Sequence, residues 1–304
     1  MSRILHVVGC GRAGRTLARL WAEQGVFRIG WIVNRSVESA AAAAGFIGQG
    51  RPATGPGPVA DGDWLMLALP DSALAPAAEQ LSDLLAARPA LAFHVSGSEP
   101  AAVLRPLGER IASVHPVCPF GDPDRALSRF AGSFAVGDGD GRALDELLPC
   151  FEAIGAQVIR FAPTDKRLYH AATIAASNFL NVLDDLALDL AEQGGMDRET
   201  ALKVVVALQR AALAGIEASG PAASLTGPIE RGDEAVCRRL AAMFDSQTSV
   251  RDQVFRALAR GAVDLAHRKH DGKHGRPPAY GSSPLQELFD EPGFVRGTGG
   301  DGGV

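Results

Sequence analysis

Hydrophobic and polar positions form two alternating patterns along the first half of the chain. Runs of consecutive apolar residues are separated by amphipathic stretches of helical periodicity, and these runs are ILHVVG, FRIGWIV, DWLMLALP, ALAFHVSG, IASVHPV, GSFAVGD and AQVIRF. Such unbroken runs are typical of strands buried on both faces of a sheet. The pattern predicts an α/β fold with a mostly parallel sheet over residues 1–162. The Gly/Pro-rich stretch 48–62 is expected to be a loop or a poorly formed third strand and helix.

The pattern changes near Pro163. From Thr164 or Asp165, either of which can cap a helix, only helical periodicity is found up to about residue 270. We therefore expect an all-helical domain over residues 163–270, divided by breaks into three or four helices. The last segment, 271–304, is too poor in apolar residues to pack, so we expect a flexible tail with a short anchor at LQELF.

Composition restricts the function classes. The chain has 304 residues, 46% apolar and 21% charged, and a net charge of -5, as in an ordinary globular protein. It has no long basic run and no stretch of membrane-spanning length, so neither nucleic acid nor a membrane is an expected partner. The four cysteines are scattered without a CxxC pair, and no signal peptide is evident. We expect a cytoplasmic protein with a small-molecule ligand.

A glycine-rich run, GCGRAG, follows the first apolar run and opens an amphipathic helix. In that position Gly9 allows a tight turn, Gly11 lets backbone N–H groups approach a pyrophosphate, and Gly14 lets the helix pack closely on the strand. The helix N-terminus, with Arg12 and Ala13, then faces the anion. This context favours a Rossmann-type dinucleotide-binding loop over a purely structural turn.

The second apolar run ends before Asn34, Arg35 and Ser36, where NAD-binding folds commonly place an acid against the ribose. An Asn, an Arg and a Ser can instead accept a 2′-phosphate, so NADP is favoured over NAD. Two alternatives stay open, in which Arg35 is a solvated loop charge or Glu38 supplies the acid. The missing acid also weighs against flavin and adenosylmethionine, without excluding them.

Polar residues follow two further apolar runs. Pro70 and Asp71 end one, and Ser96 and Gly97 follow another. The carboxyl ends of parallel strands border the ligand crevice of such folds, so these residues are expected to line the nicotinamide half of the cofactor site. Asp71 can equally be the N-cap of the next helix. His94, inside its strand, is interpreted as a core or edge histidine.

The first long helix carries a polar face that is poor in ordinary surface charges. On a helical wheel this face spans about 80° and comprises Lys166, His170, Thr173, Ser177, Asn181 and Asp184, with Asn178 at its shoulder. Its short hydrogen-bonding side chains favour a substrate-facing role over a solvated face, with Ser177 and Asn178 among the substrate ligands. Lys166 could polarise a hydride acceptor, and His170 could transfer a proton. His115, at the end of its strand, is a third catalytic candidate, with a structural role equally open.

The loop SLTGPIERGD concentrates further polar groups between two helices. Thr226, Gly227 and Arg231 are candidate substrate ligands, with Arg231 as a clamp for an anion. In the alternative interpretation, Pro228 starts a helical turn and Asp233 caps the next helix. The histidines of HRKHDGKH, His267, His270 and His274, stand among cations and predict a solvated helix end, so no metal site is expected.

Together, GCGRAG, NRS, LPDS, SVHPVCPF, DKRLYHAATIAASNFL and LTGPIERGD resemble a family that couples a Rossmann-like domain to a domain of unknown function 2520, over about residues 3–270. More distantly, the plan is similar to pyrroline-5-carboxylate reductases, ketopantoate reductases and β-hydroxyacid dehydrogenases. These enzymes bind substrate between the nucleotide domain and a helical, dimer-forming domain, so the resemblance implies a homodimer through the helical domain. A Thr-containing loop helps the first of them hold substrate, which by analogy supports Thr226.

In β-hydroxyacid dehydrogenases the catalytic Lys is followed four residues later by Asn, whereas here Lys166 is followed at that spacing by His170. The sequence predicts an NADP-dependent oxidoreductase that transfers a hydride to or from a small, anionic carbonyl or imine compound held between the two domains. Because the Lys and Asn pair is absent, the alternative is a non-catalytic NAD(P)-binding sensor or partner protein.

Overall fold

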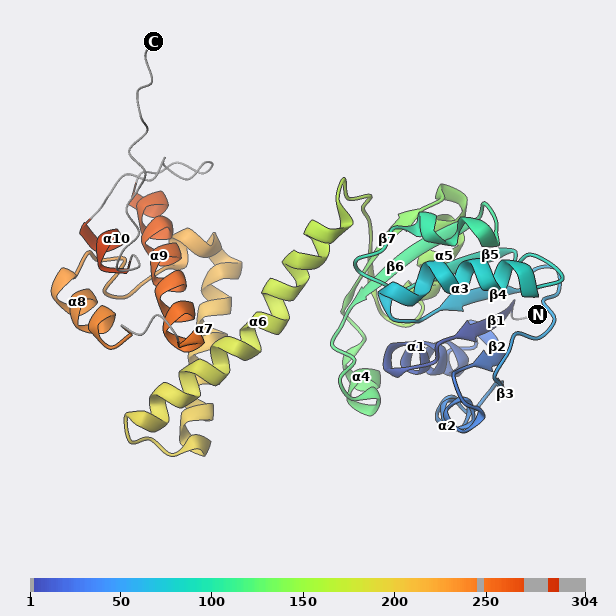
Figure 1. Ribbon diagram of the computed structural model, residues 1–304, viewed down its shortest axis with the longest axis horizontal. Coiled ribbons are helices and arrows are strands. Elements are labelled where there is room, and N and C mark those ends of the chain that lie inside the picture. The colour runs from blue at the N-terminus through green and yellow to red at the C-terminus, as the bar shows by residue number, and fades with distance from the viewer. Residues whose placement is uncertain (1–2, 245–248, 271–283, 290–304) are drawn as a thin grey trace, which may run out of the picture. The chain divides into compact units, whose positions relative to one another are not determined.

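The computed structural model describes residues 3–244, 249–270 and 284–289 (Figure 1). The chain divides into two compact units, residues 1–179 and 180–304, which are described separately. The division falls inside one long helix, α6 (Lys166–Gln193), whose first half belongs to the first unit. The domain boundary at residue 162 stays a prediction. The tail predicted to be flexible lies outside the described residues, except for 284–289.

The described part of the first unit is built on an eight-stranded sheet of order β3-β2-β1-β4-β5-β6-β7-β8. All neighbouring strands run parallel except β6 and β7, so the mostly parallel α/β fold is confirmed. Each predicted strand is present, and the Gly/Pro-rich stretch contains one short strand. The strands are β1 (Arg3–Val8), β2 (Phe27–Val33), β3 (Arg51–Ala53), β4 (Trp64–Leu67), β5 (Leu91–His94), β6 (Ile111–Val117), β7 (Phe134–Gly139) and β8 (Gln157–Arg160).

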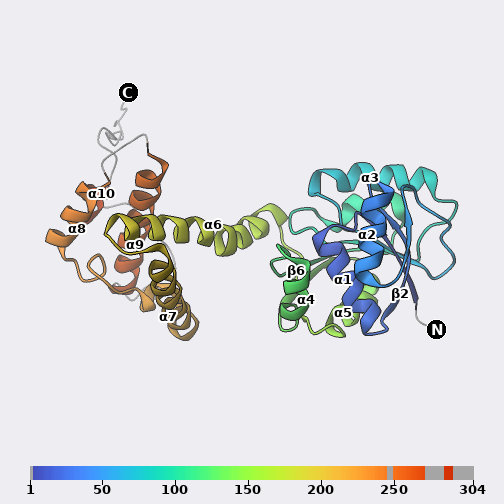
Figure 2. The same ribbon diagram turned by 90° about the horizontal axis from the view of Figure 1, so that it is seen from below.

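Helices pack against this sheet (Figure 2). They are α1 (Arg12–Glu23), α2 (Val37–Ile47), α3 (Asp71–Leu84), the 3-10 helix η1 (Ala101–Leu107) and α5 (Gly141–Glu152), whereas α4 (Pro123–Arg129) packs against α1. Side chains of α1, α2 and α5 share one apolar cluster with the sheet, centred on Trp21, whose ring contacts Phe27, Phe93 and Phe151 edge-on. Side chains of α3 and η1 form a second cluster with the sheet. Because the two clusters bury the strands of the sheet on both faces, successive strand residues are apolar, as in the runs of the sequence.

The second unit comprises the rest of α6, α7 (Arg198–Ser224), α8 (Glu234–Ala242), α9 (Val250–His270) and α10 (Pro284–Phe289). Its described residues form helices and no strand, which confirms the helical C-terminal region. Phe289 is fully buried against α8 and α9, with Cys237 and Val263 among its cluster, so the anchor predicted at LQELF is confirmed. None of the described helices combines the length and the apolar character that crossing a membrane requires.

Candidate active site

The glycine loop joins β1 to α1 and has the geometry that close backbone approach requires. Gly9 has a φ of +79°, and a Cβ added there would lie 2.4 Å from Leu69 Cδ2. A Cβ at Gly14 would lie 2.9 Å from Ala68 Cβ, whereas one at Gly11 would meet nothing within 4 Å. Helix α1 also begins without a side-chain cap, which leaves its first N–H groups open to a ligand. The loop is therefore tight on its protein side and open where an anion can approach.

The three residues after β2 have different local roles. Asn34 turns back to the glycine loop, where its Oδ1 accepts a hydrogen bond of 2.7 Å from the backbone N–H of Cys10. Ser36 is the N-cap of α2 and accepts a hydrogen bond from the N–H of Ser39. Arg35 is exposed. Asn34 and Ser36 thus shape the loop and the helix start, and Arg35 is the one that extends a charged side chain from this position.

Asp71 lies in a polar turn beside Ser96 and Ser98. Its Oδ2 accepts a hydrogen bond from Ser98 Oγ, and Ser96 Oγ accepts from the backbone N–H of Ser98 at 3.1 Å. Burial alone would raise the pKa of Asp71, but hydrogen bonds from Ser98 and Ser96 and the nearby histidines lower it overall, so the carboxylate is ionised at neutral pH. The N-cap of α3 is Pro70, so Asp71 is its first helical residue, which corrects the alternative interpretation of Asp71 as the cap.

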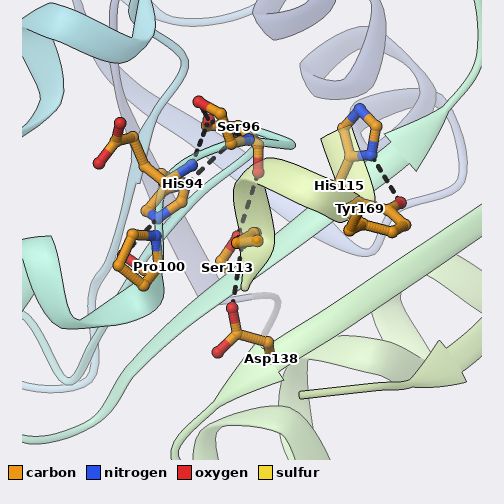
Figure 3. A network of polar contacts seen from close by, with 10 residues as sticks. His94, Ser96, Pro100, Ser113, His115, Asp138 and Tyr169 are labelled. Atoms are coloured by element: carbon orange, nitrogen blue, oxygen red, sulfur yellow. Dashed lines mark hydrogen bonds and ion pairs between the residues drawn. The ribbon is translucent and has the colours of Figure 1, made fainter. Parts of the chain in front are cut away.

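His94, at the end of β5, has no exposed surface, and both of its ring nitrogens are bonded to the backbone (Figure 3). Its Nδ1 accepts a hydrogen bond of 3.2 Å from the N–H of Ser96, and its Nε2 lies 3.2 Å from the carbonyl oxygen of Pro100. Burial, together with the charge of Lys166, lowers the pKa of His94 to about 4. His94 is therefore a neutral core histidine that holds the turn after β5, as the sequence predicted.

A polar row crosses the sheet next to His94. Ser113 of β6 is paired in register with His94 of β5 on one side and with Asp138 of β7 on the other. Lys166, the first residue of α6, donates hydrogen bonds to Ser113 Oγ and, at 3.0 Å, to Asp138 Oδ2. Its side chain is only 8% exposed, and burial lowers the pKa of Lys166 although the Asp138 carboxylate opposes this shift. The row ends in an ion pair between a buried lysine and a half-buried aspartate.

His115, Tyr169 and His170 meet beside Gly97. His115 Nδ1 lies 2.8 Å from the hydroxyl of Tyr169 (Figure 3), and the His115 and His170 rings are 6.3 Å apart. A Cβ at Gly97 would lie 2.8 Å from His170 Nδ1 and 3.0 Å from His115 Nε2, so both rings approach the glycine backbone closely. His170 Nδ1 is buried and has no hydrogen-bond partner among the described residues.

The electrostatics of this cluster favour a neutral His115. Burial lowers the pKa of His115 to about 4, and positive charge on His170 and Lys166 adds to the effect. Burial also raises the pKa of the Tyr169 hydroxyl, which therefore keeps its proton at neutral pH. The cluster offers a neutral imidazole with a phenol on one nitrogen, and a second imidazole with an unused nitrogen, which is an arrangement suited to proton transfer.

The structure brings together three sequence-predicted residues, Lys166, His170 and His115, around the turn that contains Ser96 and Gly97. Sequence reasoning missed three members of the same cluster, which are Tyr169, Ser113 and Asp138. Tyr169 lies outside the polar face of the helical wheel. Ser113 and Asp138 have no local signal, because only the antiparallel register of β6 and β7 places them side by side.

The remaining candidates lie apart from this cluster in the chain. Ser177 and Asn178 are exposed near the end of the first unit, and Ser177 Oγ donates a hydrogen bond of 2.9 Å to the carbonyl of Thr173. In the second unit, Thr226 and Arg231 are exposed, and Gly227 has a φ of +99°. These five residues stay predicted substrate ligands.

The turn that contains Arg231 has the helix-capping structure that the sequence offers as the alternative interpretation of this loop. Asp233 caps α8, since its side chain accepts a hydrogen bond of 3.1 Å from the N–H of Val236, so the predicted cap is confirmed. Lys269 and His270, at the end of α9, lie against Glu230 of the same turn. His274 lies outside the described residues.

Comparison with known protein families identifies a domain in the C-terminal part of the chain. The model of a family described as a domain of unknown function (DUF2520) matches residues 133–262. The chain contains a DUF2520 domain. No curated protein matches the sequence.

Solved structures share the fold over most of the chain. Protein TM1727 from Thermotoga maritima has a TM-score of 0.64 at 24% identity, and the match covers 87% of this chain and 100% of that one. BF3122 from Bacteroides fragilis, described as an NADP oxidoreductase, has a TM-score of 0.70 at 20% identity, with 86% and 98% covered. A 1-pyrroline-5-carboxylate reductase from Streptococcus pyogenes reaches 0.57 at 11% identity, with 89% and 98% covered. At these identities the likeness shows the fold alone.

Proposed function

We propose that this protein is an NADP-dependent oxidoreductase that transfers a hydride to or from a small, anionic carbonyl or imine compound. The observation that carries the proposal is the buried Nδ1 of His170, which lies beside His115 and Gly97 and has no hydrogen-bond partner among the residues that the structure describes. Gly97 follows β5 and the glycine loop follows β1, and both strands flank β4 in a parallel arrangement. The proton-transfer cluster and the phosphate loop therefore belong to the same edge of the sheet.

The residues present fit a dinucleotide. Gly11 leaves open space at the uncapped N-terminus of α1, where Arg12, Ala13 and Gly14 would bind the pyrophosphate. Arg35 would bind a 2′-phosphate, because a guanidinium forms bidentate hydrogen bonds with phosphate. Asp71 and Ser96 would border the nicotinamide, which supplies the hydride when it is bound.

The histidine pair would serve the proton side of the reaction. Hydride addition to a carbonyl or imine leaves an oxygen or nitrogen that must accept a proton. The Nδ1 of His170, which has no partner in the described part of the chain, is free for this purpose, and His115 is held neutral with its Nδ1 against Tyr169. Arg231 stays the candidate clamp for the anionic group of the substrate, with Thr226, Gly227, Ser177 and Asn178 as further ligands.

Deuterium transfer tests the chemistry directly. Purified protein is incubated with deuterated NADPH and panels of keto acids and imines, and mass spectrometry follows the label. We expect transfer to at least one compound, and a loss of about 100-fold or more in kcat for His170→Ala, because general acid catalysis contributes that much. Thermal stabilisation by NADP in either redox state, without label transfer to any compound, would instead favour a non-catalytic NADP-binding protein.

The cofactor choice has its own test at two adjacent residues. Arg35→Ala should weaken NADP binding about tenfold or more and leave NAD binding nearly unchanged, because a charge-assisted contact to the 2′-phosphate is lost. Asn34→Ala should weaken both cofactors, since its Oδ1 holds the N–H of Cys10 in the glycine loop. Isothermal titration calorimetry measures both constants, and an equal loss of NAD and NADP in Arg35→Ala would contradict the assignment.

We also propose a homodimer through the second unit. Helix α7 exposes large apolar side chains on one face, with Leu202, Leu213 and Ile216 at 48%, 56% and 42% exposure. Exposed apolar surface of this extent supports association with a second copy. Sedimentation equilibrium should give a dimer for the wild type and for Arg238→Ala on α8, and a monomer for Leu213→Glu. A wild-type monomer at micromolar concentration would contradict the proposal.

A further inference from the structure

The charge of Lys166 is satisfied by the protein itself. Its ammonium group donates to Ser113 Oγ and lies 3.0 Å from Asp138 Oδ2, and its side chain is 8% exposed. Ser113 and Asp138 are register partners on β6 and β7, so oxygens from two adjacent strands converge on one nitrogen. Moving the ammonium away would leave the half-buried Asp138 carboxylate, whose side chain is 18% exposed, without its partner. Lys166 is therefore held at one point above the sheet.

The two side chains that reach His115 follow Lys166 on the same helix. Tyr169 places its hydroxyl 2.8 Å from His115 Nδ1, and His170 places its ring 6.3 Å from that of His115. Residues three and four positions along a helix lie on the same side as the first. The point at which Lys166 is bound therefore sets where Tyr169 and His170 stand.

Apart from the contacts of Tyr169 and His170 with His115, the described residues of this turn provide no further attachment to the sheet. The Arg167 side chain is 85% exposed and pairs with Asp165, two positions earlier in the chain. Leu168 is 70% exposed. His170 packs closely against the turn after β5, because a Cβ at Gly97 would lie only 2.8 Å from His170 Nδ1. A small displacement of the turn would thus change the histidine pair.

We propose that Lys166 is a positioning residue: bound to Ser113 and Asp138, it fixes the first turn of α6 so that Tyr169 and His170 meet His115 beside Gly97. This role differs from the polarisation of a hydride acceptor that the sequence predicts for Lys166, since the ammonium is turned to the sheet. The inference rests on the proposed function only where it takes the histidine pair as the proton-transfer group.

A double-mutant cycle read on His115 separates positioning from simple electrostatics. The titration of His115 is followed by NMR of protein with 13C-labelled histidine, in the wild type, Tyr169→Phe, Lys166→Met and the double variant. The Lys166→Met side chain keeps nearly the same length and loses the ammonium. The same cycle with Arg167→Met is the control, because that change removes a neighbouring charge that does not bind the sheet.

We expect Tyr169→Phe to shift the pKa of His115 in the wild-type and Arg167→Met backgrounds, and to have no further effect in Lys166→Met, where the Tyr169 contact is already lost.

A charge that acts on His115 only through space is independent of Tyr169, so shifts that add would overturn the proposal. An unchanged His115 pKa in Lys166→Met, or no effect of Tyr169→Phe in the wild type, would overturn it as well. If Lys166→Met does not fold, Asp138→Asn replaces it in the cycle, since this change weakens the same attachment without removing the ammonium.

Cofactor binding in the same variants completes the test. Lys166→Met should keep its NADP dissociation constant within about threefold, because the ammonium is engaged by Ser113 and Asp138. A loss above about tenfold would assign Lys166 to the cofactor and overturn the positioning role. Absence of any turnover would count against the proposed oxidoreductase and leave the result on His115 intact, so the two proposals fail independently.

Discussion

The first unit contains two kinds of histidine. His6 and His94 have both ring nitrogens engaged: His6 Nδ1 accepts a hydrogen bond from the N–H of Trp31 at 3.1 Å, and its Nε2 lies 3.0 Å from Asp63 Oδ2. The His6 ring also stacks on the Trp31 ring at 4.4 Å. His94 is engaged by Ser96 and Pro100 in the same complete way.

His115 and His170 differ because their ring nitrogens are not all used by the fold. His115 gives one nitrogen to Tyr169 and places the other beside Gly97, and His170 buries an Nδ1 without a partner among the described residues. A buried polar group without a partner costs free energy, so a fold that contains one at the carboxyl ends of its strands has a reason outside stability. We conclude that complete pairing marks the structural histidines and incomplete pairing marks the candidates for chemistry.

Among changes at the fully paired histidines, the largest loss of stability is expected when Asp63, the partner of His6, is replaced. Its Oδ2 accepts from His6 Nε2 at 3.0 Å and from the N–H of Ala60 at 2.9 Å. Asp63→Ala removes the acceptor of two donors at once, which should lower the free energy of unfolding by about 3 kcal/mol. Urea denaturation measures this loss, and NADP affinity serves as the control that should not change. A loss below about 1 kcal/mol would mean that His6 is not a structural histidine in this sense.

Acid should destabilise the protein through His94. Its folded pKa of about 4 lies below the ordinary value of 6.5, so the unfolded chain takes up the proton first. The stability gained from a neutral His94 is complete above about pH 6.5 and is lost as the pH falls toward 4, by about 2 kcal/mol at pH 5. Urea unfolding at pH 7 and pH 5 should show this loss in the wild type and a smaller one in His94→Gln. Equal losses in both proteins would show that His94 does not cause the destabilisation by acid.

A smaller effect should follow from crowding the His6 ring. A Cβ at Gly30 would lie 2.2 Å from His6 Nδ1 and 2.9 Å from Ile4 Cγ2, so Gly30→Ala must displace the imidazole from the N–H of Trp31. We expect a destabilisation of about 1.5 kcal/mol in urea denaturation. Gly45→Ala is the matched control, because a Cβ there meets nothing within 4 Å. Equal stability of the two variants would contradict the close packing of His6.

The smallest effect on stability is expected for replacement of His170, one of the two incompletely paired histidines. His170→Ala removes a ring whose Nδ1 makes no hydrogen bond among the described residues, so the free energy of unfolding should change by no more than about 0.5 kcal/mol. The same variant should lose turnover in the deuterium-transfer assay. A destabilisation as large as that of Asp63→Ala would place His170 with the structural histidines and break the comparison.

The sequence by itself determined the local features of this protein. Apolar runs identified the buried strands, because burial on both faces removes the polar alternation. The glycine pattern located the loop after β1, and a change of period placed the start of the helical region close to Lys166. These signals are readable because the energies behind them arise between residues that are near one another in the chain.

Only the tertiary structure decided which polar groups are partners. The polar helix face identifies Lys166 as a candidate site residue, but its binding to Ser113 and Asp138 depends on the register of β6 against β7. Tyr169 acquires its role from His115, which is 54 positions earlier in the chain, and Asn34 acquires its role from the backbone of Cys10. Buried polar groups must be paired, and the partner of each is the polar group that the order and register of the strands bring near it. That proximity is a property of the fold, and it separates a lysine that positions a helix from one that faces a ligand.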